Sequence, residues 1–287
     1  MRTLGQVLLG SASVVGFAVT IIAVGLLYPN GLTAGVDMVA YIRAGTAIRE
    51  GGLVYTTGVA TTAAFLYPPT WAVLFAPLSL LPGAVLQAAV MALDVLALRY
   101  VLGSWLAVGL MGLYPLTWFG LGSGNVDILI AGAIVAAWRH SSVPLALMTF
   151  TKVSPVFALD VRRIREFTIA CLILVAITAP WLDLWLEYAR FLAAQPAVAG
   201  TIVPIPWFVR LPFALLLLLP RRPWTSALAA IVAIPNWYWY TSLILMAPLR
   251  LWLDGRRDAD TGDRSGVLPR MPTPPPASSA PNTPDAT

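Results

Sequence analysis

The chain has 287 residues, of which 59% are hydrophobic and 11% are charged, and its mean hydropathy is +0.80. So few polar residues cannot cover the surface of a soluble globule, so the composition predicts a helical protein that crosses a membrane several times. A membrane β-barrel is excluded because the apolar runs lack the regular alternation with polar residues that a barrel wall requires.

The net charge of +5 comes almost wholly from arginine. The basic residues form small clusters between apolar runs, which is typical of cytoplasmic loops and argues against nucleic acid as a partner. The chain has one cysteine, Cys171, and one histidine, His140 beside Arg139. We therefore expect no disulfide framework, no metal site and no cofactor.

The first long apolar run extends from Leu4 to Tyr28 and is long enough to cross a bilayer. Pro29-Asn30-Gly31 ends it. A secretory signal peptide is the alternative, because Arg2 is basic, but the run is longer than the apolar region of such a peptide. We interpret it as the first span, with its amino terminus inside the cell.

Residues 31–66 are more polar and are expected to form the first extracytoplasmic loop. Tyr41, Ala44 and Ile48 recur there at helical spacing, opposite Arg43 and Glu50. This pattern predicts a short amphipathic helix at the membrane interface, stopped by Gly51-Gly52. The next helix should begin near Tyr67-Pro68-Pro69, since paired prolines suit a first helical turn.

Nine further apolar segments follow, and several are too short to cross a bilayer straight. They cover Thr70 to Leu81, Ala84 to Leu98, Trp105 to Phe119, Val126 to Trp138, Val143 to Leu159, Phe167 to Leu184, Trp207 to Leu219, Trp224 to Ile234 and Trp237 to Leu253. The fold class is therefore an all-α, polytopic transmembrane bundle of roughly eight to ten spans, including broken helices. The breaks either line a polar cavity or reflect the ordinary frequency of proline and glycine in membrane helices; they lie at Pro115, Gly122-Ser123-Gly124, Pro144, Pro155 and Pro235.

Basic loops set the expected orientation. The residues expected to face the cytoplasm are Arg2, the cluster of Arg162, Arg163 and Arg165, Arg221-Arg222 and Arg256-Arg257, which places the loop of Asp37 outside a plasma membrane. Between residues 84 and 160 the basic residues fit this scheme only if one segment re-enters instead of crossing. The membrane domain should cover residues 1–255, and residues 256–287, rich in proline, serine and threonine, should form a disordered cytoplasmic tail.

Asp37 is the leading candidate for chemistry, because it is an acid at the edge of a membrane span. It either caps the interfacial helix or acts as a base, and one side chain can do both. Tyr41, Arg43, Tyr55 and Tyr67 follow it and supply hydrogen bonds, a cation and aromatic faces, which are the groups that bind sugars and phosphates.

Four other polar residues lie in apolar surroundings. Lys152, the chain's one lysine, should pair with an anion, face water or snorkel, and a phosphate is one such anion. Asn125 either caps the following helix or bonds a sugar or phosphate at its amino terminus. Asp94 and Asp127 are interpreted as buried polar contacts between helices and rank below Asp37.

Several motifs occur in an order that resembles family 87 of the GT-C glycosyltransferases. They are Asp37-x-x-x-Tyr41, Gly52-Leu-Val-Tyr55, Phe65-Leu-Tyr67-Pro68-Pro69 with Pro77-Leu78 and Leu81-Pro82, Gly124-Asn125, and Lys152-Val-Ser-Pro155. The resemblance covers residues 37–155 well and the remainder loosely, and the Tyr-Pro-Pro element is its most specific part. The family comprises mannosyl- and arabinofuranosyltransferases of bacterial envelopes that use polyprenyl-phosphate sugars.

This resemblance implies a GT-C-like bundle whose first outer loop carries the catalytic aspartate. Asp37 would accept the proton of the acceptor hydroxyl while the lipid-linked sugar is attacked with inversion of configuration. The partners would be a polyprenyl-phosphate sugar donor, an envelope glycolipid or glycan acceptor, and membrane lipid. No second acid is close to Asp37 in the sequence, so side chains and not a metal are expected to balance the phosphate charge.

The sequence departs from the family pattern at two motifs. Gly122-Ser-Gly-Asn125 stands where the family has Gly-Gln-x-Asn, and Trp237-Tyr-Trp-Tyr240 has no histidine where the family has Trp-x-His-x. Tyr240 is a substitute for that histidine, or these rings form an interfacial aromatic belt. Two other functions stay open. A transporter or lipid flippase would also need broken helices and a few acids in the membrane, and the two departures from the family pattern are compatible with an inactive GT-C homologue.

Overall fold

The computed structural model describes residues 4–27, 35–55, 65–194, 203, 205–235 and 237–261. Every regular element within these ranges is helical, as the sequence predicts. The α-helices are α1 (Leu4–Leu27), α2 (Val36–Glu50), α3 (Pro69–Leu78), α4 (Gly83–Leu102), α5 (Trp105–Met111), α6 (Pro115–Ser123), α7 (Asp127–Arg139), α8 (Val143–Thr149), α9 (Ile164–Thr178), α10 (Leu182–Ala194), α11 (Trp207–Leu218), α12 (Pro223–Val232) and α13 (Met246–Thr261). Short 3-10 helices cover η1 (Ser154–Ala158), η2 (Val161–Arg163), η3 (Ala179–Trp181) and η4 (Trp239–Leu245).

Three of the described helical stretches are long and apolar enough to cross a membrane. They are Leu4–Ala23, Gly83–Leu102 and Val161–Leu192, and the last joins α9 to α10. The pair α5 and α6, bent by 95°, adds a fourth candidate as a broken span or a re-entrant loop. The sequence predicts eight to ten spans, and three or four described stretches are long enough to be one. Helices such as α3 and α12 have 10 residues each, so each extends only about 15 Å, about half the thickness of the hydrocarbon core.

Proline and glycine end or start helices where the sequence analysis placed breaks. Pro115 begins α6, Gly124 ends it with φ +73°, and Pro155 lies in η1. Pro144 instead lies in the first turn of α8, where the missing N–H costs nothing. The bend between α5 and α6 falls in the region where one re-entrant segment was expected.

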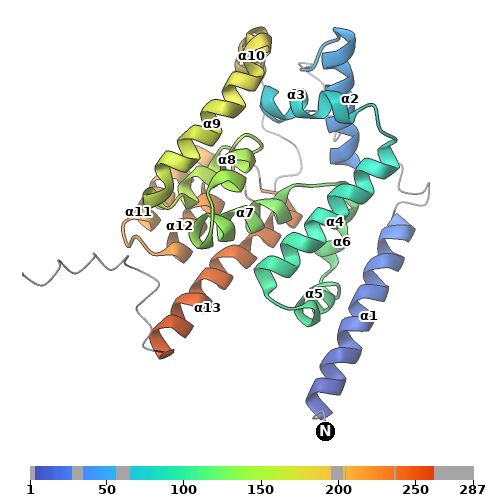
Figure 1. Ribbon diagram of the computed structural model, residues 1–287, viewed down its shortest axis with the longest axis vertical. Coiled ribbons are helices and arrows are strands. Elements are labelled where there is room, and N and C mark those ends of the chain that lie inside the picture. Colours follow the sequence, from blue (N-terminus) through green and yellow to red (C-terminus); the bar gives the residue numbers. More distant parts are fainter. Residues whose placement is uncertain are drawn as a thin grey trace, which may run out of the picture. The chain divides into compact units, whose positions relative to one another are not determined.

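The interfacial helix predicted from sequence is α2, and Gly51 terminates it in the left-handed conformation at φ +70°. Met38, Tyr41 and Ala44 form its buried side, which packs against α3 (Figure 1). A Cβ on Gly45 would lie 2.4 Å from the Phe75 carbonyl oxygen, so the two backbones approach closely at that point. Within residues 31–66, the predicted outer loop, the structure describes residues 35–55, which include α2, and residues 65–66.

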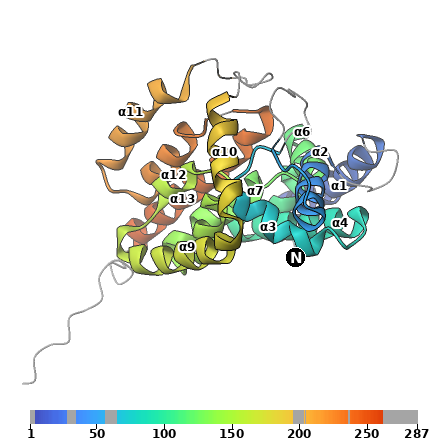
Figure 2. The same cartoon turned by 90° about the horizontal axis from the view of Figure 1, so that it is seen from above.

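Helix α7 lies at the centre of the larger of two compact units, Met1–Trp252 (Figure 2). It packs against α4, α8 and η4, and Ile130, Ile134 and Val135 are buried. Because α7 is apolar and enclosed by other helices, its first residues have fixed surroundings. The amino-terminal end of α7 is where the polar residues discussed below meet.

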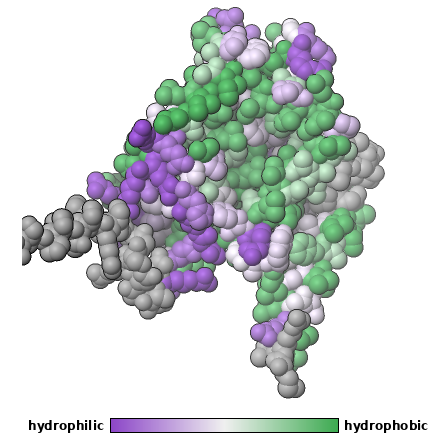
Figure 3. All heavy atoms as spheres, viewed as in Figure 1, coloured by the Kyte–Doolittle hydropathy of each residue, from purple (hydrophilic) through white to green (hydrophobic). Residues whose placement is uncertain are grey.

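The candidate spans expose large apolar side chains, which is expected of surfaces that face lipid. Leu4 and Ile21 of α1 and Leu172 of α9 are examples. In Figure 3 hydrophobic residues cover the upper part of α9 and much of the face shown, whereas the broadest hydrophilic area lies at the left, near the amino-terminal end of α9, and smaller ones lie beside the upper end of α10 and the carboxyl-terminal end of α2. This distribution supports a membrane protein.

The second compact unit is Leu253–Thr287. Its described part continues α13 to Thr261, so the chain is still helical at Arg256, where the polar tail was expected to begin. Residues 262–287, for which disorder was expected, lie outside the described residues.

Candidate functional site

Asp37 lies in the first turn of α2, and its side chain is half-buried. Its Oδ2 accepts a hydrogen bond from Nδ2 of Asn125 at 2.9 Å. The N-cap residue of α2 is Gly35, so Asp37 does not cap the helix, which was one of the two readings of the sequence. Its carboxylate is directed instead toward the turn that precedes α7.

Burial raises the pKa of the Asp37 carboxyl above its ordinary value. The hydrogen bond from Asn125 and the positive charge of Lys152 oppose this rise, and the charge of Asp127 adds to it. The sequence offered no second acid near Asp37, but the fold brings Asp127 into its surroundings, 90 positions further along the chain. A carboxylate with a raised pKa is a better proton acceptor than an exposed one.

Asn125 connects two structural elements through one amide. Its Nδ2 donates to Asp37, and its Oδ1 accepts the backbone N–H of Asp127 at 2.8 Å, in the first turn of α7. Gly124 before it adopts φ +73°, which turns the chain from α6 into α7. The N-cap residue of α7 is Val126, so Asn125 does not occupy the capping position predicted as one of its two roles; its amide instead links the start of α7 to Asp37.

Lys152 pairs with Asp127, its Nζ contacting Oδ1. The side chain of Lys152 is 15% exposed and that of Asp127 is 1% exposed. Of the three outcomes expected for Lys152, which were pairing with an anion, facing water or snorkelling, the structure shows pairing with an anion, and that anion is the carboxylate of Asp127; the buried polar contact expected of Asp127 is this pair. The exposed part of this pair therefore belongs to the Lys152 side chain, and a second anion could approach it there.

Tyr41 and Tyr67 are buried next to each other beside Asp37. Their ring centroids are 5.0 Å apart in an edge-on arrangement, and Tyr41 also meets Trp71 and Phe75. Burial raises the pKa of both phenols, and the charge of Asp37 raises it further. Both hydroxyl groups therefore stay protonated at neutral pH.

Tyr55 contacts Tyr67 through its hydroxyl group and α10 through its ring. Its hydroxyl donates to the backbone carbonyl of Tyr67 at 2.8 Å, and its ring packs on Tyr188 and Phe191 of α10. Arg43, by contrast, lies on the exposed side of α2, because two residues rotate a helix by about 200° away from Tyr41. The structure does not bring Arg43 together with the other predicted residues.

Tyr240 stacks on Tyr238 with ring centroids 5.4 Å apart and an angle of 18° between the planes. Burial raises the pKa of Tyr238, and the charges of Asp37 and Asp127 raise it further, which places this phenol near both carboxylates. Tyr240 was predicted from sequence as a site residue, whereas Tyr238 was not. The departure from the family pattern at the Trp-x-His-x position, which contains Tyr238, was the sequence signal that could have found it.

Two buried polar residues of α4 complete the surroundings. Gln87 is 1% exposed and hydrogen-bonds to backbone groups of three residues, Gly35, Leu121 and Gly122. Asp94, two turns further along α4, is fully buried, and within the described residues neither of its carboxyl oxygens has a hydrogen-bond partner. Asp94 stands out in the sequence as a charge in an apolar helix, whereas Gln87 was not predicted, because a single glutamine in an apolar helix belongs to no motif.

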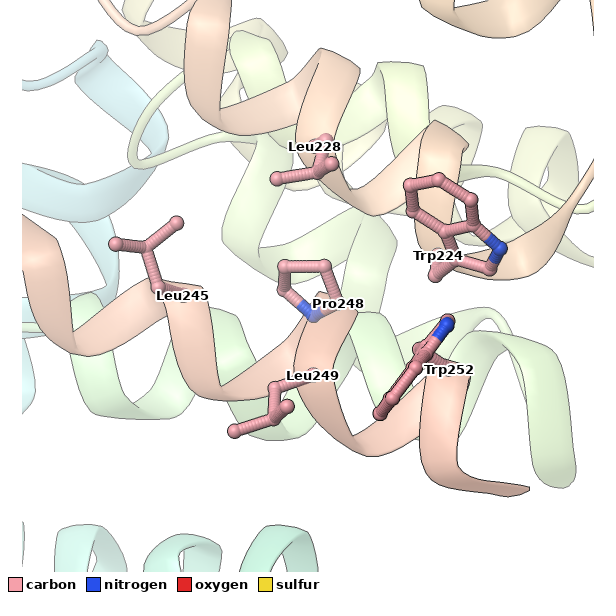
Figure 4. Close-up of a pocket in the computed structure, with 6 residues that line it drawn as sticks. All are labelled: Trp224, Leu228, Leu245, Pro248, Leu249 and Trp252. Atoms are coloured by element: carbon pink, nitrogen blue, oxygen red, sulfur yellow. The ribbon is translucent and has the colours of Figure 1, made fainter. Parts of the chain in front are cut away.

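A separate apolar groove of about 290 Å³ lies between α12 and the start of α13. Figure 4 shows the indole rings of Trp224 and Trp252 at one end of it, and its lining consists of Trp224, Leu228, Leu245, Pro248, Leu249 and Trp252. None of these side chains can act as an acid, base or nucleophile. The groove therefore does not compete with Asp37 as a chemical site.

Among the described residues, no group of three or more His, Cys, Asp or Glu side chains could hold a metal ion. Comparisons of the chain with models of protein families, with curated proteins and with solved structures find no match. Five of the predicted site residues, Asp37, Tyr41, Tyr67, Asn125 and Lys152, converge from separate segments of the chain with Asp127 and Tyr238.

Proposed function

We propose that the chain is an integral-membrane, inverting glycosyltransferase that moves mannose or a similar sugar from a polyprenyl-phosphate donor to an envelope glycolipid or glycan. The observation that carries the proposal is the half-buried Asp37 carboxylate, held by Asn125 and lined by tyrosines, within the electrostatic reach of Lys152. The motif resemblance to family 87 of the GT-C glycosyltransferases agrees with it.

Asp37 serves as the general base. It takes the proton from the acceptor hydroxyl as that oxygen bonds to the anomeric carbon of the sugar. The bond from that carbon to the phosphate oxygen breaks at the same time, and its electron pair leaves with the phosphate, so the configuration inverts. Burial raises the pKa of Asp37, which strengthens it as a base while leaving it ionised above that pKa.

Lys152 balances charge on the leaving phosphate. Its ammonium is paired with Asp127, which fixes it in place, and its partial exposure leaves room for a second anion. The protonated hydroxyl of Tyr238, which is half-buried, can donate a hydrogen bond to a sugar or phosphate oxygen. Tyr41 is fully buried, so it packs beside Asp37 and, contrary to the prediction from sequence, does not bind substrate directly. In this arrangement the site faces outward, as the basic loops predict, and the chain resides in the plasma membrane.

The test uses the full chain in proteoliposomes with radiolabelled polyprenyl-phosphate mannose and envelope lipid extract as acceptor. Asp37→Asn is expected to lower transfer by roughly 10²–10⁴-fold, the usual contribution of a general base. Glu50→Gln, at the exposed far end of the same helix, is the matched control and should transfer normally. Equal transfer by Asp37→Asn and wild type would overturn the assignment of the base.

A membrane transporter is a second candidate, favoured by one observation. Asp94 is fully buried in a candidate span, and ionisable groups in such positions often mark ion pathways. Uptake of solute by the same proteoliposomes, without any transfer of radiolabel, would support the transporter against the glycosyltransferase.

A further inference from the structure

Gln87 joins the two chain segments that carry Asp37 and Asn125. Its Oε1 accepts the backbone N–H of Gly35 at 2.9 Å, two residues before Asp37. Its Nε2 donates to the carbonyl oxygen of Leu121 at 2.9 Å and of Gly122 at 3.3 Å, just before Asn125. Since an N–H can only donate and a carbonyl can only accept, these partners fix the orientation of the amide.

The two segments touch at glycine. A Cβ on Gly35 would lie 2.1 Å from the carbonyl oxygen of Gly122, so a larger residue could not occupy that position without displacing the neighbouring backbone. A Cβ on Gly124 would lie 3.1 Å from Oε1 of Gln87. The amide of Gln87 therefore fills the space beside this contact and satisfies its backbone groups.

We propose that Gln87 is a positioning residue for the candidate base: by holding Gly35 against Leu121 and Gly122, it sets the distance between the Asp37 carboxylate and the Asn125 amide. Gln87 touches neither reacting atom and acts through these two residues. The inference deepens the proposed function and rests on it in so far as Asp37 is the base. The hydrogen bonds of Gln87 themselves are independent of any activity.

A purely structural role would make Gln87 a donor and acceptor for buried backbone groups and nothing more. The two roles differ in what happens to Asp37. If Gln87 sets the Asp37–Asn125 distance, its loss weakens the hydrogen bond that opposes the effect of burial, and the pKa of Asp37 rises further. If it is only structural, stability falls and the ionisation of Asp37 stays as it was.

The experiment measures modification of Asp37 by a hydrophobic carbodiimide, which reacts with protonated carboxyl groups, as a function of pH in the full chain in nanodiscs. Peptide mass spectrometry reads the modified fraction. Gln87→Met keeps the side-chain length without the amide and is expected to move the labelling midpoint of Asp37 to higher pH. Gln87→Asn, one methylene shorter, is the variant to use if the methionine variant does not fold, and is expected to shift the midpoint in the same direction.

Ser13→Ala is the matched control. Ser13 also joins distant segments, donating from α1 to the Leu106 carbonyl at 2.9 Å, and its hydrogen bonds go to Leu9 and Leu106, away from the segments that Gln87 joins. Its variant should leave the labelling midpoint unchanged. In the transfer assay Gln87→Met should lower kcat by about 10- to 100-fold, with a smaller change in the donor KM, because misplacement affects chemistry more than binding.

An unchanged midpoint in a folded Gln87 variant would overturn the proposal. If neither wild type nor variant transfers sugar but the midpoint shifts, the positioning role of Gln87 stands and the proposed enzyme function fails. If wild type transfers sugar and Gln87→Met retains both its kcat and its labelling midpoint, the enzyme function stands and the role of Gln87 fails.

Discussion

Asn125 donates a hydrogen bond to Asp37 at 2.9 Å although the two residues are 88 positions apart in the chain. The same amide accepts the backbone N–H of Asp127 at the start of α7. An amide bonded on both sides has little rotational freedom, so the position of the Asp37 carboxylate depends on where α7 begins. Since α7 is enclosed by other helices, the carboxylate is held on a rigid support.

Asn125→Ala is expected to shift the acidic limb of the pH profile of sugar transfer to higher pH. The hydrogen bond from Asn125 lowers the pKa of Asp37, whereas burial raises it, so its removal leaves burial less opposed. A base with a higher pKa is protonated, and inactive, over a wider acidic range. Measuring kcat/KM against pH checks this, with Glu50→Gln as the control, and an unshifted limb would mean that Asp37 is not the titrating base.

Asp37→Asn is expected to make the protein more stable at neutral pH while removing its activity. The folded-state pKa of Asp37 is raised above the ordinary value of 3.8, so folding favours the protonated form. The stability associated with that proton is present below pH 3.8 and is lost as the pH rises through the folded-state pKa. An amide does not ionise and loses nothing over this range.

Thermal unfolding in detergent at neutral and acidic pH measures this effect. The Tm advantage of Asp37→Asn over wild type should be present at neutral pH and should vanish below the ordinary pKa of the carboxyl. The exposed Glu50→Gln should show no such pH-dependent advantage. A lower Tm for Asp37→Asn than for wild type at neutral pH would contradict the cost assigned to burial.

The pair of Asp127 and Lys152 predicts an asymmetric double-mutant cycle. Lys152→Met leaves a carboxylate that is 1% exposed without its partner, and should destabilise the protein by about 3–5 kcal/mol. Asp127→Asn leaves an ammonium whose side chain is 15% exposed and can reach water, so its cost should be smaller.

The double variant tests whether the two residues act on each other. Removing both charges leaves neither one buried alone, so the double variant should be more stable than Lys152→Met. Denaturant unfolding of all four proteins gives the coupling energy. Strictly additive losses would mean that the pair contributes no mutual stabilisation.

The sequence predicts the helices better than it predicts their relation to the membrane. The start of α3 at Pro69 and the end of α2 at Gly51 follow from local backbone preferences, which proline and glycine carry within a few residues. Among the described residues, three or four helical stretches meet the length and hydropathy of a span, fewer than the eight to ten predicted, because apolar composition shows that a segment is buried without showing whether protein or lipid surrounds it. Helix α7 is apolar and enclosed by other helices.

The sequence predicts those site residues whose type is unusual for their surroundings. It does not predict those that reach the site only through the packing of distant segments. Asp37 and Lys152 stand out as charges in apolar surroundings, and Asn125 follows a glycine-rich turn. The proximity of Asp127 and Tyr238 to Asp37 depends on how α7 and η4 pack, a relation between distant segments that no local pattern encodes. The hydrogen bonds of Gln87 with the backbone fall in the same class.

Substitution of Asp94 should affect a transporter and a glycosyltransferase differently. The carboxyl group of Asp94 is fully buried in α4 and, within the described residues, its oxygens have no hydrogen-bond partner, so no hydrogen bond connects it to the site around Asp37. Asp94→Asn should therefore retain sugar transfer and be at least as stable as wild type, because a neutral amide of the same shape avoids a buried ionisable group. In an ion-coupled transporter the same variant should lose solute uptake, since the group that binds and releases the ion is gone. Assaying transfer and uptake in one proteoliposome preparation, with Asp37→Asn as the variant expected to lose transfer, decides between them: loss of uptake in Asp94→Asn, with no sugar transferred by wild type, would assign transport to this fold.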